Sequence, residues 1–140
     1  MDQKLNSILL IDDDEPTNFL NRRMLEQMHC ANNIQVIQKA QEALTYLNEL
    51  ATPDNSLPFP DIIFLDINMP AMDGWEFLDA IRSIMNAKKK PIMLIMLTTS
   101  LNPEDEQKAK CSEQVTAFKN KPLSREMVKD ILKHYYSASA

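Results

Sequence analysis

Cysteine is scarce in this chain. Cys30 and Cys111 are the only two cysteines among 140 residues, and they lie far apart in the sequence. They form neither a pair of metal ligands nor the framework of a disulfide-rich fold. Because few cysteines are typical of proteins that stay in a reducing compartment, we expect a cytoplasmic protein.

Long apolar runs are missing too. A helix that crosses a membrane needs about 20 mostly apolar residues, and no stretch of the sequence meets this requirement. The N-terminal segment MDQKLNS lacks the pattern of a signal peptide. The sequence therefore predicts no membrane among the partners of the protein.

The chain also lacks an excess of positive charge. With 15 lysines and arginines against 20 acidic residues, the net charge is −5 and the pI is about 5.0. Because binding to nucleic-acid phosphates requires a basic surface, this balance argues against nucleic acid as a direct partner. We interpret one basic run, at 88–90, as the solvated end of a helix.

What is present suits one globular domain. The 140 residues, 44% hydrophobic and 25% charged, can bury a core without help from disulfides or a structural metal. We expect residues 1–140 to form a single domain whose core covers about 7–136. The irregular stretch 52–60, which holds three prolines, predicts a surface loop within that domain.

Five short apolar segments predict strands, at 8–11, 34–37, 62–65, 92–97 and 115–118. The first, third and fourth are almost continuously apolar, which is typical of strands that are buried on both faces of a parallel sheet. Amphipathic segments that predict helices alternate with these strands. The resulting order, βαβαβαβαβα, predicts an α/β fold with right-handed crossovers.

The predicted helices cover 16–28, 41–50 and the residues that follow Gly74, Asn102 and Ser124. In the first helix the apolar face consists of Leu20, Met24, Leu25 and Met28. The fourth helix has few apolar residues, so it is either merely exposed or a mobile element of low local stability. In the last helix we expect one of the two tyrosines, Tyr135 and Tyr136, to lie in the core.

Acidic residues follow two of the predicted strands. Asp12, Asp13 and Asp14 come after the first strand, and Asp66 ends the third. Ligands of parallel sheets bind at the carboxyl ends of the strands. If these strands are neighbours, the carboxylates repel each other, so that some are protonated or a cation lies among them. Oxygen ligands of this kind favour Mg²⁺, although acids before a helix are also common as polar turns.

Two further strand ends carry polar residues. Thr98, Thr99 and Ser100 follow the fourth strand, and Lys121 precedes Pro122 after the fifth. A hydroxyl there can donate a hydrogen bond to a phosphoryl oxygen, and a lysine can pair with an anion. Each feature alone is compatible with a cap or a solvated side chain. Their occurrence at four different strand ends predicts one site.

Four motifs carry a resemblance to a known family. They are ILLIDDDE at 8–15, FLDINMPAMDGWEFL at 64–78, IMLTTS at 95–100 and KNKPL at 119–123. In this order they resemble the receiver domain of two-component response regulators over nearly the whole chain. The resemblance implies a flavodoxin-like receiver fold: a doubly wound α/β domain with a five-stranded parallel sheet in the order 2-1-3-4-5.

The resemblance also implies the roles of single residues. Asp66 is similar to the phosphoacceptor of the family. Asp13 is similar to its direct Mg²⁺ ligand and Asp12 to the acid that acts mostly through water. Together with Asp66, the backbone carbonyl of Asn68 would complete the protein ligands of the cofactor Mg²⁺.

Further positions match the family's switch residues. Thr98 resembles the hydroxyl residue that contacts the phosphoryl group, and Lys121 the lysine that pairs with it, with a cis bond before Pro122. Phe118 stands at the switch-aromatic position. Gly74 matches a turn where a positive φ is plausible. The stretch 111–114 departs from the family, which often has glycine before the fifth strand.

The implied function is that of a stand-alone receiver, of the single-domain chemotaxis or phosphorelay type. It would accept a phosphoryl group on Asp66 from a sensor histidine kinase or a histidine phosphotransfer protein. It would signal to a protein partner through the fourth helix, the fifth strand and the fifth helix. We expect no enzyme in the usual sense, since such a domain catalyses only its own phosphorylation and dephosphorylation.

Three alternatives remain at this point. A degenerate receiver would act as a scaffold without phosphorylation. A phosphatase of the haloacid dehalogenase type also uses a strand-end aspartate and Mg²⁺, but its Asp-x-Asp motif follows the first strand of a larger fold. A flavodoxin-like module needs a phosphate loop after the first strand, where the sequence DDDEPTN would repel a phosphate.

Overall fold

The computed structural model describes residues 4–87, 92–99 and 102–139. The basic run at 88–90 and Ser100 lie outside these residues. Five parallel strands form one sheet in the order β2-β1-β3-β4-β5, as predicted. Their bounds are β1 Leu5–Ile11, β2 Ala31–Ile37, β3 Ile62–Asp66, β4 Met93–Thr98 and β5 Ala117–Asn120.

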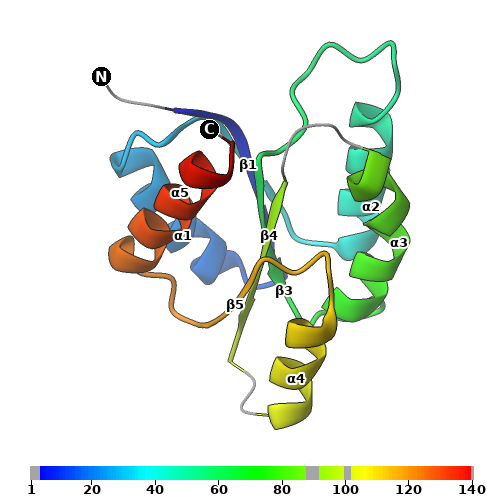
Figure 1. Cartoon of the computed structure of the whole chain (residues 1–140), viewed down its shortest axis with the longest axis vertical. Helices are drawn as coiled ribbons and strands as arrows, with labels where there is room; N and C mark the ends of the chain where they lie inside the picture. Colours follow the sequence, from blue (N-terminus) through cyan, green and yellow to red (C-terminus); the bar gives the residue numbers. More distant parts are fainter. Residues whose placement is uncertain (1–3, 88–91, 100–101, 140) are drawn as a thin grey trace.

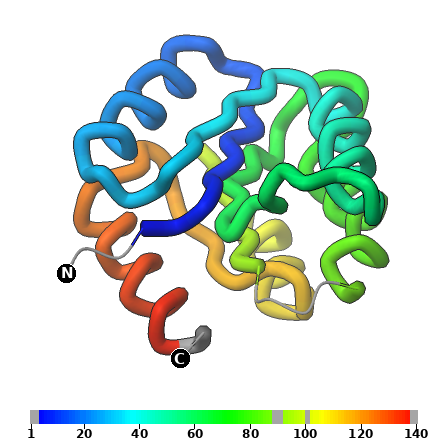
Figure 2. The backbone as a smooth tube through the Cα atoms, turned by 90° about the horizontal axis from the view of Figure 1, so that it is seen from above, coloured from blue at the N-terminus to red at the C-terminus, as the bar shows by residue number. Residues whose placement is uncertain are grey.

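Five helices surround the sheet. Helices α1 (Glu15–Gln27) and α5 (Arg125–Ser139) cover one face, and α2 (Ala40–Leu50) and α3 (Gly74–Ala87) cover the other (Figures 1 and 2). Helix α4 (Pro103–Cys111) lies beside the β5 edge. Residues 52–60 form the predicted irregular loop between α2 and β3.

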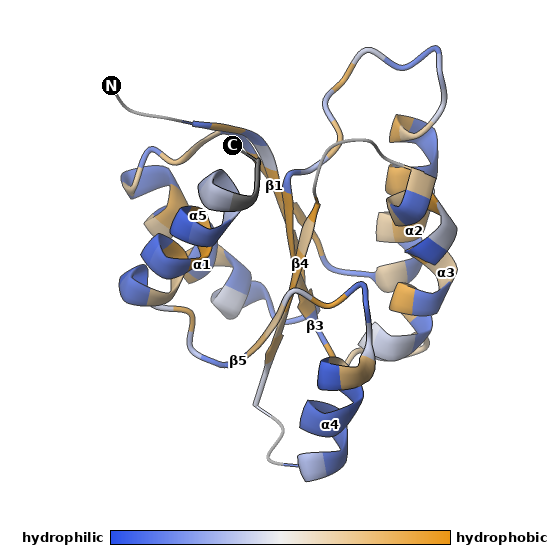
Figure 3. Cartoon of the chain, viewed as in Figure 1, coloured by the Kyte–Doolittle hydropathy of each residue, from blue (hydrophilic) through white to orange (hydrophobic). Residues whose placement is uncertain are grey.

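The sheet separates two apolar cores. Leu10, Phe64 and Ile95 belong to the core under α1 and α5, whereas Leu9 and Leu65 belong to the core under α2 and α3. Successive residues of a strand point to opposite faces, so strands with a core on each face are apolar throughout. Figure 3 shows this apolar sheet between helices whose outer surfaces are hydrophilic.

Strand β5 lies two residues further along the chain than predicted. It begins at Ala117, which pairs with Ile95, and continues through Lys119 and Asn120. The apolar pattern marked Val115 and Phe118, which pack half-buried against the core under α2 and α3, but the strand is defined by the residues that hydrogen-bond to β4. Polar residues at the edge of the sheet take part in that pairing without carrying an apolar signal.

The predicted inner face of α1 is partly wrong. Leu20 was expected in the core, but 65% of it is exposed. The buried residues of the helix are Asn18, Asn21 and Leu25, which share one face. Leu25 is buried and Met24 and Met28 pack against the core as predicted, so Leu20 is the error, and two amides share the inner face with these residues.

Helices α4 and α5 agree better with expectation. Asn102 caps α4 by accepting a hydrogen bond from the N–H of Glu104 at 3.0 Å, and Ala109 is its only buried residue. In α5, Tyr135 is buried and Tyr136 is partly exposed, as predicted. Within the described residues, no helix combines the length and the apolar character needed to cross a membrane.

Candidate functional site

The acids after β1 and β3 meet at one edge of the sheet. Ile11 pairs with Leu65, so Asp12 and Asp66 stand side by side at the carboxyl ends of adjacent strands. Both are buried, and Asp13 is exposed beside them. Carboxylate oxygens of these three residues lie within 4.8 Å of one another. The predicted convergence of the acids is confirmed.

Lys121, which directly follows the edge strand β5, also reaches this cluster. Its Nζ lies 2.6 Å from Oδ2 of Asp12 and 3.4 Å from Oδ1 of Asp66. The backbone N–H of Lys121 donates to the carbonyl of Thr98 at 2.9 Å, which fixes the residue just beyond β5. The bond to Pro122 is cis, as predicted.

The electrostatics of the site set Asp66 apart. Burial, together with the negative charge of Asp12, raises the pKa of Asp66 from 3.8 to about 6, although Lys121 and the N–H of Asn68 oppose this rise. Burial alone would lower the pKa of Lys121, but its hydrogen bond to Asp12 and the charges of Asp12 and Asp66 raise it. The carboxylates are therefore crowded, and one ammonium only partly neutralises them.

The cluster fits a hard divalent cation. Its donors are carboxylate oxygens only, and the exposed Asp13 leaves one side open to water, as Mg²⁺ sites require. Asp12 is held by two further contacts. Its Oδ1 accepts from the N–H of Asp14 at 2.9 Å, and its backbone carbonyl accepts from Nδ2 of Asn18 at 2.7 Å. Sequence reasoning missed Asn18, although an amide on a buried helical face is a detectable signal.

Comparison with known proteins identifies the family. The response regulator receiver domain family matches residues 8–133. This chain belongs to the response regulator receiver domain family. A two-component response regulator from Cytophaga hutchinsonii has a similar structure, with a TM-score of 0.85 and 34% identity over 96% of this chain and 98% of that one.

Two relatives show the range of proteins that contain similar receivers. Response regulator Rcp1 of Synechocystis sp. is 31% identical over 70% of this chain and 65% of its own length. Hybrid signal transduction histidine kinase L of Dictyostelium discoideum is 30% identical over 94% of this chain. The chain spans only 7% of that kinase. Receivers similar to this one thus occur both in short regulators and inside large kinases.

The single glycine of the receiver serves a purpose other than the predicted one. Gly74 does not have a positive φ; among the described residues His29 (51°) and Ala71 (69°) do. The N–H of Gly74 donates to the carbonyl of Ile67 at 2.8 Å. A Cβ at position 74 would lie 2.7 Å from the carbonyl oxygen of Asp66. Glycine is required there because α3 begins in close contact with the backbone of Asp66.

The predicted switch residues of the receiver share one face of the sheet. Thr98 ends β4 and is fully buried. Phe118, on β5, pairs with Met96 and packs, half-buried, against the core under α2 and α3. Because Thr98 lies two residues beyond Met96, its side chain points to that same face. Asn68 is exposed just after Asp66.

A polar contact joins α3 to α4 in the receiver. Nε1 of Trp75 donates to Oδ1 of Asp105 at 3.1 Å, and Nζ of Lys108 lies 4.8 Å from the centre of the Trp75 ring. Trp75 directly follows Gly74, whose backbone contacts Asp66. A helix with one buried residue is thus attached to the segment that supports the acid cluster.

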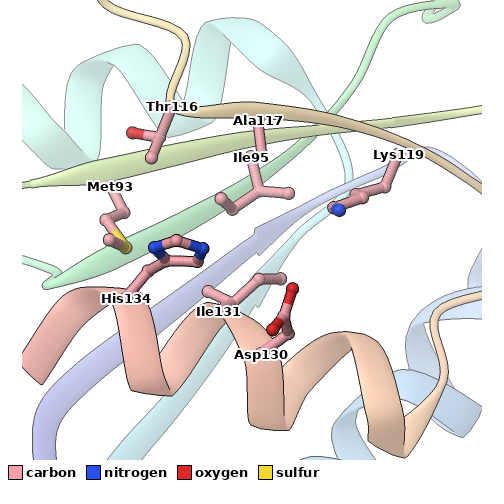
Figure 4. Close-up of a pocket in the computed structure, with 8 residues that line it drawn as sticks. All are labelled: Met93, Ile95, Thr116, Ala117, Lys119, Asp130, Ile131 and His134. Atoms are coloured by element: carbon pink, nitrogen blue, oxygen red, sulfur yellow. The ribbon is translucent and has the colours of Figure 1, made fainter.

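A groove of about 240 Å³ lies elsewhere, between α5 and the β4–β5 edge (Figure 4). Its floor is apolar, with Ile95, Ala117 and Ile131, and Lys119, Asp130 and His134 lie around it. No member of the acid cluster lines this groove. This groove is therefore separate from the acid cluster.

Proposed function

We propose that this receiver accepts a phosphoryl group on Asp66 from a phosphohistidine, carried by a sensor histidine kinase or a histidine phosphotransfer protein. One observation carries the proposal: a buried carboxylate, with Asp12 and Lys121 around it, ends a central strand beside an exposed acid. The similarity to receivers inside a histidine kinase supports this class of donor.

The reaction would need no general base. A carboxylate oxygen of Asp66 attacks phosphorus, the new O–P bond forms, and the P–N bond to the donor imidazole breaks. A proton from solvent completes the neutral histidine that leaves. With a pKa of about 6, Asp66 is largely ionised at neutral pH and is available as the nucleophile.

Lys121 and Thr98 would stabilise the transferred group. Lys121 already lies 3.4 Å from Asp66, so that a modest movement of its ammonium would pair it with a phosphoryl oxygen. Thr98 would donate its hydroxyl from the end of β4. The ligands of Mg²⁺ would be Asp12, Asp13, Asp66 and the carbonyl of Asn68. When bound, Mg²⁺ supplies positive charge that balances the phosphoryl oxygens.

The output surface would comprise α4, β5 and α5. Thr98 and Phe118 share one face of neighbouring strands, so that a movement of one affects the space of the other. Trp75 connects the phosphoacceptor segment to α4. We further propose that the protein works in the cytoplasm as a stand-alone receiver that recruits a protein partner. Detection of the endogenous protein at 16.1 kDa in a cytoplasmic fraction would test this.

The mass of the intact protein after incubation with acetyl phosphate tests the proposed reaction. We expect a gain of one phosphoryl group that depends on Mg²⁺, decays with time and is absent in Asp66→Asn. Asp13→Asn should weaken the binding of Mg²⁺, so that labelling requires a higher Mg²⁺ concentration, without removing the acceptor. A wild-type protein that gains no mass, under conditions that label a known receiver, would contradict the proposal and favour a phosphorylation-independent scaffold.

A further inference from the structure

Helix α1 directs two amides toward the core of the receiver. Asn18 is 3% exposed and Asn21 is 8% exposed, whereas Phe19 and Leu20 between them face solvent. An apolar residue at either inner position would have satisfied the periodicity of the helix. Because a buried amide destabilises a protein unless it is hydrogen-bonded, the arrangement indicates a role beyond packing.

The orientation of the Asn18 amide is fixed by its neighbour. Nδ2 of Asn18 donates to the backbone carbonyl of Asp12 at 2.7 Å. With the amide reversed, two oxygen acceptors would face each other at that distance. Oδ1 of Asn18 therefore points elsewhere. It is buried, and it has no hydrogen-bond partner among residues 4–87, 92–99 and 102–139.

A small cavity lies next to this amide. Its volume is about 10 Å³, and its polar lining comes from Asp12, Asn18, Asn21 and Asp66. The rest of the wall is apolar: Leu10, Ile11, Phe64 and Leu97. A space of about 10–15 Å³ with several polar partners holds one water molecule, whereas a fully apolar cavity of this kind stays dry.

We propose that this cavity binds a single water molecule between Asn18 and Asp66, and that Asn18 is a positioning residue for the phosphoacceptor. The inference rests on the proposed function, because it assigns a purpose within the same site. A water molecule has two protons to donate, one to Oδ1 of Asn18 and one to the Asp66 carboxylate. The amide of Asn21, on the same wall, can donate to the water oxygen.

The bound water would orient the Asp66 carboxylate. One carboxylate oxygen is held by a hydrogen bond from inside the protein, and the other then faces the open side of the acid cluster. A larger ligand does not fit the volume, and the two acids repel an anion. The chemistry of the lining therefore selects water.

A high-resolution crystal structure tests the water site directly. In the wild type we expect density for one water within hydrogen-bonding distance of Oδ1 of Asn18. In Asn18→Leu, whose side chain has a similar size but no acceptor, that density should be lost. A cavity that is empty in the wild type, at a resolution where other internal waters are visible, would overturn the proposal.

The rate of phosphorylation by acetyl phosphate at saturating Mg²⁺ tests the positioning role. Asn18→Leu should react about tenfold more slowly, as expected for the loss of one hydrogen bond to a charged group. Asn18→Ser should recover most of the rate, because its hydroxyl can bond both to the water and to Asp12. Asn48→Leu, the same substitution at an exposed site of α2, serves as the control and should react like the wild type.

The positioning role of Asn18 and the proposed function of the receiver can be refuted separately. A purely structural role of Asn18 would lower the urea midpoint of Asn18→Leu but leave the rate per folded molecule unchanged, and that result would overturn the positioning role. So would an Asn18→Ser variant as slow as Asn18→Leu. A wild-type protein that is not phosphorylated at all would refute the proposed function, and the crystal structure would still decide whether the cavity binds water.

Discussion

Strand β3 carries a buried carboxylate at each end, and the two have opposite surroundings. Asp61 precedes the strand and Asp66 ends it, and each is 6% exposed. The Asp61 carboxylate accepts hydrogen bonds from the N–H groups of Asn6 at 2.7 Å and Ser7 at 3.3 Å, and from the Tyr135 hydroxyl at 3.0 Å. Asp66 is next to Asp12, with Lys121 3.4 Å away.

This difference shows that burial alone does not decide what a carboxylate does. At the amino end of β3, three donors satisfy Asp61, which joins β1 to α5 and holds the fold together. At the carboxyl end, burial and the charge of Asp12 make the ionised Asp66 unfavourable, and Lys121 offsets this only in part. Proteins often give up stability in this way where a reactive group is needed.

The largest effect on stability should come from the amino end of β3, where three donors satisfy the carboxylate of Asp61. Asp61→Ala leaves two backbone N–H groups and the Tyr135 hydroxyl without their acceptor. We expect the free energy of unfolding to fall by about 3–5 kcal/mol, measured by urea denaturation. Asp54→Ala in the exposed loop is the control. If Asp61→Ala proved as stable as this control, the structural role of the amino end would be refuted.

At the carboxyl end of β3, substitution of Asp66 should raise the free energy of unfolding, and the size of this effect should depend on pH. The pKa of Asp66 is raised in the folded protein to about 6, so its contribution to stability is fully present below pH 3.8 and is lost as the pH rises through 6. Without Mg²⁺, Asp66→Asn should therefore gain stability relative to the wild type between about pH 4 and 7, by up to about 3 kcal/mol.

Urea denaturation of both proteins across this pH range measures the gain. The difference should be small at pH 4 and constant above pH 7. A difference that does not change with pH would show that the pKa of Asp66 is not raised in the folded state.

A smaller effect is expected at the edge of the Asp61 site. Tyr135→Phe removes one of the three donors while the ring remains packed in the core. The free energy of unfolding should fall by about 1–2 kcal/mol, and phosphorylation should be unchanged. In the Asp61→Ala background, Tyr135→Phe should lower the free energy of unfolding by less, because the acceptor of the hydroxyl is already gone. Equal losses of free energy in both backgrounds of this double-mutant cycle would show that the pair does not interact.

The smallest effect is spectroscopic and concerns only the carboxyl end. Trp75 is the only tryptophan, and it contacts Asp105 and Lys108 of α4. Phosphorylation with acetyl phosphate and Mg²⁺ should change its fluorescence, since its neighbour Gly74 touches Asp66. Asp105→Ala should alter the emission before phosphorylation. Fluorescence that stays constant in a protein labelled to completion would show that the surroundings of Trp75 and α4 do not respond to phosphorylation.

The carboxyl end could be predicted from the sequence and the amino end could not. Asp66 stands in a distinctive motif at the end of an apolar strand, the alternating pattern predicted the α/β fold, and the resemblance to receivers implied the order of the strands. The donors to Asp61, by contrast, lie 55 and 74 residues away in Asn6 and Tyr135. Contacts over such separations leave no periodic signal, and an acid after Pro60 resembles an ordinary loop residue.

The errors have a common physical origin. Leu20 was assigned to the core because periodicity counts apolar residues, whereas the helix turns its amides toward the acids. Gly74 was assigned a positive φ because that is the usual reason for glycine, but here the reason is space. In both cases a contact with a residue outside the helix decides the outcome, and the periodicity of the helix does not contain that contact.

The close contact at Gly74 limits how the receiver can be engineered. A single added methyl group at this position would press on the carbonyl of Asp66, so no substitution there is silent. Positions 29 and 71, which have positive φ values without glycine, are by comparison open to redesign toward glycine. A library that aims at a faster or slower receiver should therefore keep position 74 constant.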